Sequence, residues 1–130
     1  MFGLEKQLQT ISTPAYFLDV ESQEILAVNA QFARLMGYDP AELLKMTAAQ
    51  MRPSEDVAKL KRALQQPPPR GAVEWRYKTR DGTIIYVQLT VRDSMHVDDA
   101  AGRHRNVRMV VISKWDPQPL KTSDQLFGES

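Results

Sequence analysis

The chain has 130 residues, enough for one domain that buries roughly two thirds of its unfolded surface and too few for two ordinary domains. Hydrophobic residues make up 42% of the chain and charged residues 25%, so the composition excludes disordered, collagen-like and disulfide-scaffold proteins. A net charge of +1 argues against nucleic-acid binding, and the lack of cysteine excludes disulfides, thiolate metal sites and cysteine nucleophiles. No apolar run reaches the roughly 18 residues of a membrane span, and Glu5 and Lys6 replace the apolar part of a signal peptide. We therefore expect a cytoplasmic protein with no membrane partner.

The first predicted element is a short amphipathic helix within residues 1–13. Leu4, Leu8 and Ile11 recur at spacings of four and three, which places them on one stripe of an otherwise polar helix. Apolar stretches at 15–20 and 25–28 then predict two short strands joined by a polar turn.

A helix is predicted directly after the second strand. Asn29 is a suitable N-cap, Phe32 and Met36 fall on one helical face, and Gly37 ends the helix in the left-handed conformation. Asn29 is therefore interpreted first as a cap and only second as a ligand contact.

Two more helices are predicted before the chain becomes β-rich. Residues 39–42 read as a capping box with proline at the first helical position. Ser54 is predicted to cap the next helix, which ends before the three prolines at 67–69. These prolines favour a surface connection, and a proline motif for a partner is the less favoured alternative.

A β-hairpin is predicted from strands at 73–79 and 83–91. A two-residue Asp-Gly loop would mix apolar and polar side chains on both faces of the hairpin. A three-residue loop with Gly82 in the left-handed position makes one face wholly apolar, so burial favours the longer loop. The side chains expected to face the helices are Val73, Trp75, Tyr77, Val87 and Leu89, with Tyr77 opposite Ile85, Trp75 opposite Val87 and Val73 opposite Leu89.

The polar residues 96–105 are predicted to form a loop into a final strand, 106–115. This strand is apolar on both faces for part of its length, which predicts a central position in the sheet. Residues 117–130 read as a polar tail or linker. If Val107, Met109 and Val111 face the helices, the outer face of the sheet carries Ile84, Tyr86, Val110 and Ile112.

The order of elements is that of an α+β protein, and it resembles the PAS domain family. The resemblance is carried by residues 14–44, 52–60 and 74–91. Each segment alone is weak evidence, but the three together are specific for the family. It implies a PAS domain over 14–116 with a five-stranded antiparallel sheet in the order 2-1-5-4-3, short helices on one face and a small cavity between them. It also implies a sensory or dimerising role in a larger signal-transduction regulator, such as a two-component system with an effector domain.

The sequence also departs from the family. Members that feed an effector commonly end on an Asp-Ile-Thr-like step into a coiled coil, whereas residues 113–117 here end in a proline with no heptads behind it. We expect that the chain either was cut from a longer protein or stands alone.

Without cysteine, the flavin-adduct chemistry of the family is excluded, and residues 54–66 lack the histidine of its haem-binding members. His96 and His104 are expected to be solvated, so we expect no metal and no cofactor, with non-covalent flavin as the less favoured alternative.

Two functions remain open at this point. The first is a sensory module that binds a small ligand in the cavity; the second is a ligand-free module that dimerises or docks a partner. The N-terminal helix either folds back over its own sheet or lies on the sheet of a second copy, and the resemblance favours a homodimer.

No nucleophile with a paired base, glycine-rich phosphate loop or metal motif is present in the sequence, so no enzyme is predicted. The candidate cavity-lining residues are Asn29, Phe32, Met36, Trp75 and Tyr77.

Overall fold

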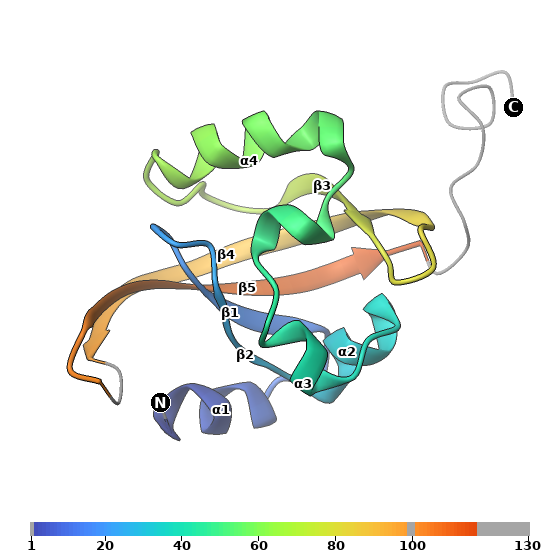
Figure 1. Ribbon diagram of the computed structural model, residues 1–130. Helices are drawn as coiled ribbons and strands as arrows, with labels where there is room; N and C mark the ends of the chain where they lie inside the picture. The colour runs from blue at the N-terminus through green and yellow to red at the C-terminus, as the bar shows by residue number, and fades with distance from the viewer. Residues whose placement is uncertain (1, 99–100, 117–130) are drawn as a thin grey trace, which may run out of the picture.

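The computed structural model of the protein describes residues 2–98 and 101–116, and it is built around one five-stranded sheet (Figure 1). All neighbouring strands are antiparallel, and their order is β2-β1-β5-β4-β3. This confirms the predicted fold class and the central position of the last strand. The strands are β1 (Ala15–Asp19), β2 (Ile25–Val28), β3 (Val73–Lys78), β4 (Ile84–Asp98) and β5 (His104–Trp115).

Helices lie on both faces of this sheet (Figure 1). One face carries α2 (Ala30–Met36), α3 (Pro40–Leu43) and α4 (Val57–Leu64), together with the 3-10 turns η1 (Ala48–Met51) and η2 (Ser54–Asp56). The N-terminal helix α1 (Phe2–Gln9) lies on the other face, against β1 and β2. None of the helices in the described ranges is both long and apolar enough to cross a membrane.

Local capping explains where α2 and α3 begin. Asn29 Oδ1 accepts hydrogen bonds from the backbone N–H of Phe32, at 2.9 Å, and of Ala15, at 3.1 Å. Gly37 ends α2 at a φ of 80°, and the predicted capping box at Asp39 is present at the start of α3. These predictions are confirmed.

The predicted cap at Ser54 was wrong. Ser54 opens a separate 3-10 turn, and α4 begins only after Asp56, whose carboxylate binds Arg76 at 2.7 Å. The serine therefore lies two residues before the N-cap position of α4, which Asp56 occupies.

The register of the β3–β4 hairpin is the predicted one. Tyr77 lies opposite Ile85 and Trp75 opposite Val87. Gly82, at a φ of 88°, occupies the left-handed position that the three-residue loop requires. The apolar face of the hairpin consequently packs against α2, α3 and α4, as expected.

The final hairpin is longer than predicted. The loop expected over 96–105 was wrong, because 96–98 belong to β4 and 104–105 to β5, with Asp98 opposite His104. The ladder is built from backbone groups and continues past the apolar core, so hydrophobicity marks only part of each strand.

The expected orientation of β5 was also wrong. Val110 and Ile112 face α2, α3 and α4, because their cross-strand partners, Val91 and Leu89, lie on that side. Val107, Met109 and Val111 instead pack against α1. The outer face therefore keeps Ile84 and Tyr86 but loses the two residues expected from β5.

Helix α1 takes the first of the two predicted arrangements and covers its own sheet. Leu4 and Leu8 are fully buried against Phe17, Ala27 and Val107. The helix stripe thus forms a second small core within one chain, on the side opposite the main core.

Candidate functional site

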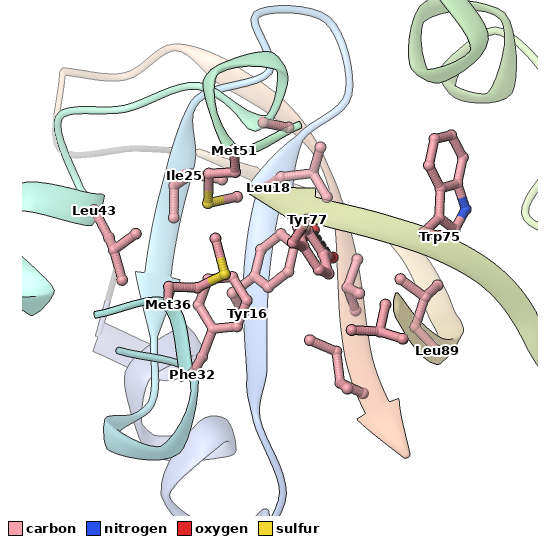
Figure 2. Close-up of a cluster of buried hydrophobic side chains, with 14 of the residues drawn as sticks. Tyr16, Leu18, Ile25, Phe32, Met36, Leu43, Met51, Trp75, Tyr77 and Leu89 are labelled. Carbon is pink, nitrogen blue, oxygen red and sulfur yellow. Dashed lines mark hydrogen bonds between the residues drawn. The ribbon is translucent and has the colours of Figure 1, made fainter. Parts of the chain in front are cut away.

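A cavity of about 60 Å³ lies between α4 and the sheet, on the face covered by the main helices. The aliphatic part of its wall comes from α4 and the central strands, and Trp75 of β3 adds an aromatic surface. Figure 2 shows Trp75 and Leu89 beside the packed group of Tyr16, Phe32 and Tyr77. The lining residues are Tyr16, Leu18, Arg52, Leu60, Ala63, Leu64, Pro69, Trp75, Leu89, Val91, Arg108 and Val110.

Arg52, which directly follows η1, brings the first charge to this wall. Its side chain is buried, with 4% of the residue exposed, and its guanidinium stacks 4.5 Å above the ring of Trp75 and 4.1 Å above that of Tyr77. Nη2 donates to the hydroxyls of Tyr16 and Tyr77 at 3.4 Å, and Nη1 donates to a backbone carbonyl at 3.5 Å. These long contacts hold the group in place but supply no opposite charge.

Arg108 of β5 brings the second charge. It is 7% exposed and donates from Nη2 to the carbonyl of Gln66 at 2.5 Å and from Nη1 to that of Ala63 at 3.4 Å. It thereby caps the C-terminal end of α4, where a cation is favourable. Burial lowers the pKa of its guanidinium from the usual value.

Both guanidinium groups have an unused donor. In the described part of the chain, Arg52 Nε and Arg108 Nε are the buried side-chain nitrogen or oxygen atoms without a hydrogen-bond partner. A buried N–H without a partner costs about 1–3 kcal/mol, more for a charged group. Buried polar atoms are nearly always hydrogen-bonded in folded proteins, so two unpartnered Nε atoms on residues that line one small cavity call for an explanation.

Two buried tyrosines, Tyr16 and Tyr77, are hydrogen-bonded to each other at the cavity. The hydroxyls of Tyr16 and Tyr77 are 2.7 Å apart, drawn as a dashed line in Figure 2. Burial raises the pKa of Tyr77 well above its usual range. The cavity wall therefore contains two cations and no acidic residue, and the hydroxyl of Tyr77 supplies no negative charge.

The structure brings together only some of the predicted site residues. Trp75 lines the cavity, and Tyr77 borders it through its hydrogen bond to Tyr16. Phe32 and Met36 lie in the adjoining core, and the amide of Asn29 is used for capping.

Sequence reasoning missed both arginines. The sequence shows Arg108 as a charged residue within an apolar strand, but the expected orientation of that strand placed it on the outer face. No sequence pattern marks Arg52 as buried, because its burial depends on β3, which follows about 20 residues later.

A larger hollow of about 860 Å³ is an open groove between α2 and the β3–β4 turn. It is lined by two exposed arginines, Arg34 and Arg80, and Arg80 is already paired with Glu42 at 3.0 Å. Within 2–98 and 101–116, no group of three or more His, Asp or Glu side chains is placed to hold a metal. The small cavity is therefore the better candidate site.

Comparison with known proteins agrees with this architecture. The family model described as "PAS fold" matches residues 4–110 of the chain. The PAS domain of an HTR-like protein from Haloarcula marismortui is 19% identical, with a TM-score of 0.63 over 86% of this chain and 88% of that one. A PAS domain from a two-component sensor histidine kinase is 18% identical, with a TM-score of 0.62 over 84% and 90%. A light-oxygen-voltage domain studied with a flavin analogue is 20% identical, with a TM-score of 0.60 over 93% and 87%. No protein with a curated description matches the chain.

Proposed function

The chain belongs to the PAS family, and from this premise we propose that it is a cytoplasmic sensory module of a signal-transduction regulator that holds a small ligand in the cavity beside α4. The observation that carries the proposal is the cavity itself, whose wall combines an apolar surface with two unused buried donors. A wall of mostly apolar side chains with a few convergent polar groups is the usual character of a ligand site. Its fold likeness to a sensor-kinase PAS domain supports the signalling role.

The size of the cavity argues against a flavin. Sites for drug-sized ligands occupy about 300–1,000 Å³, whereas this cavity has about 60 Å³. The chain also lacks the cysteine that a covalent flavin adduct needs. We propose that the module binds neither flavin nor haem and takes a ligand of a few non-hydrogen atoms.

Ligand occupancy can be tested on the purified protein. We expect native mass spectrometry, or two-dimensional NMR during titration with a library of small polar molecules, to reveal a ligand that perturbs the amides of α4 and β3. The absorption spectrum should show no band above 400 nm. A protein that is empty as purified and that shifts with none of the library compounds would overturn the ligand-binding proposal.

A second function, homodimerisation through the outer sheet face, is favoured by the part of that face which α1 leaves uncovered. Among the residues whose burial the structure describes, which leave out 93–97 of β4, the small core under α1 contains residues of β1, β2 and β5 and none of β3 or β4. Ile84 and Tyr86 of β4 lie on this uncovered part and are half-buried. We propose that two copies meet there, next to their α1 helices.

Sedimentation velocity tests the dimer. We expect a dimer for the wild type at about 100 µM, the concentration range typical of weak self-association, and a shift to monomer for Tyr86→Gln. Leu44→Gln is the matched control, because Leu44 is an apolar residue with 44% exposure that lies outside this face. A wild type that is monomeric at this concentration would exclude the dimer. Changes at Leu4 or Leu8 are unsuitable, because they disrupt the core under α1 within one chain.

A further inference from the structure

We propose that the cavity beside α4 binds the carboxylate of a short-chain organic acid between Arg52 and Arg108. This inference rests on the proposed ligand-binding function and adds the chemical class of the ligand. Both arginines line the same cavity of about 60 Å³, and none of its lining residues is acidic.

The charge of the cavity wall is the first argument. Arg76 and Arg105 show how this chain treats its other partly or fully buried arginines: Arg76 binds Asp56 at 2.7 Å, and Arg105 binds Asp19 at 3.1 Å. Arg52 and Arg108 bond only to hydroxyls and carbonyls in the described structure. Asp56 interacts with Arg52 electrostatically but does not hydrogen-bond to it, and it does not line the cavity. Taking a cation out of water costs several kcal/mol unless an opposite charge compensates. The cavity therefore favours an anion over a neutral molecule or a cation.

The unused donors indicate which anion fits. Each guanidinium has its Nε–H free, and both arginine side chains are buried and line the cavity. A carboxylate has two oxygens that accept charge-assisted hydrogen bonds from guanidinium groups in plane. Two unused donors match the two oxygens of a monoanion. A phosphate or sulfate would leave further oxygens unbonded against an apolar wall.

The rest of the wall determines the size and polarity of the remainder of the ligand. Leu60, Leu89 and Val91 contribute aliphatic side chains to the wall, and Trp75, on whose ring the Arg52 guanidinium stacks, contributes an aromatic one. A volume of 60 Å³ is about twice the share of one water molecule in the liquid. These features fit an aliphatic acid of the size of acetate or propionate.

Titration of ¹⁵N-labelled protein with sodium propionate at pH 7 tests the inference, with ionic strength held constant by sodium chloride. Propionamide is the neutral control, since it has the same shape without the charge. We expect saturable shifts of the Arg52 and Arg108 Nε–H signals and of the last amides of α4, and binding of propionate at least about tenfold tighter than that of propionamide, as charge-assisted bonds to a guanidinium predict.

Two variants locate the site. Arg52→Gln and Arg108→Gln should each weaken propionate binding about tenfold or more, whereas Arg80→Gln should leave it unchanged because Arg80 is exposed and paired with Glu42 outside this cavity. If either cavity variant fails to fold, the wild-type comparison of propionate with propionamide decides the question.

Two results would overturn the carboxylate inference while leaving the ligand-binding function intact. One is equal affinity for propionate and propionamide, which would indicate a site for neutral molecules. The other is phosphate binding as tight as that of propionate, which would indicate an anion site of another class. If neither propionate nor any compound of the small-molecule library shifts the signals, the inference and the proposed function both fail.

Discussion

Replacing Phe32 by alanine should lower the free energy of unfolding by about 3–5 kcal/mol, the usual cost of removing a fully buried phenylalanine. Phe32 has no exposed surface, and its ring lies 4.5 Å from that of Tyr16 in a stacked arrangement and 5.9 Å from that of Tyr77 edge-on. Figure 2 shows it packed beside Met36 and Tyr16. Removal of the ring leaves a void that the surrounding helices and strands cannot close without moving.

Urea unfolding at pH 7 measures this effect. Leu44→Ala is the matched control, because Leu44 follows α3 and is 44% exposed, so its loss should change stability by no more than about 0.5 kcal/mol. Trp75→Ala should cost on the order of 3 kcal/mol, since Trp75 is 9% exposed and borders only a small cavity. A loss below about 1 kcal/mol for Phe32→Ala would contradict the core described here.

The β3–β4 hairpin shows what the sequence could predict. Its register follows from local quantities: the side chains alternate between two faces, and only one loop length puts all the apolar ones on the same face. Asn29 and Gly37 were predictable for a related reason, because a cap forms with residues a few positions away. Such features need no knowledge of distant segments.

The last strand shows where this reasoning ends. β5 is apolar on both faces because α1 covers one and α2 to α4 cover the other, so its own pattern contains no information about which face is which. In its pairing with β4, Leu89 lies opposite Ile112 and Gln88 opposite Lys114, so Ser113 is an extra residue. This bulge interrupts the alternation of side chains beside Trp115.

The candidate site was predictable only in part. Trp75 could be placed on the inner face from the hairpin register. The burial of Arg52 and Arg108 depends on contacts between α4, β3 and β5 that no local pattern encodes. Polar residues inside a core are also the positions where local preference and final structure disagree, which is a common sign of function.

Asp19→Asn should destabilise the protein by about 3 kcal/mol at pH 7, the lower end of the range for breaking a buried ion pair. Asp19 and Arg105 are 3.1 Å apart, and their side chains are only 5% and 8% exposed. The variant leaves the guanidinium of Arg105 buried with one carboxylate instead of two, because Glu24 still binds it at 2.6 Å. Glu24→Gln is the matched control: this carboxylate binds the same cation but is 48% exposed, so its loss should cost about 1 kcal/mol or less.

The pH dependence of stability provides a second test of the contribution of Asp19. Burial alone would raise the pKa of Asp19, but hydrogen bonds from the backbone N–H of Ser22 and from Arg105 outweigh it, and the net effect lowers the pKa below the usual 3.8. A carboxyl whose pKa is lower in the folded state stabilises the fold fully at pH values above its unfolded pKa, and this contribution is lost as the pH falls through the folded pKa. The wild type should therefore lose stability below about pH 4, and the difference between wild type and Asp19→Asn should narrow there. Urea unfolding of both proteins at pH 7 and pH 3 measures it, and a difference that stays constant or widens in acid would show that Asp19 does not stabilise the fold through its charge.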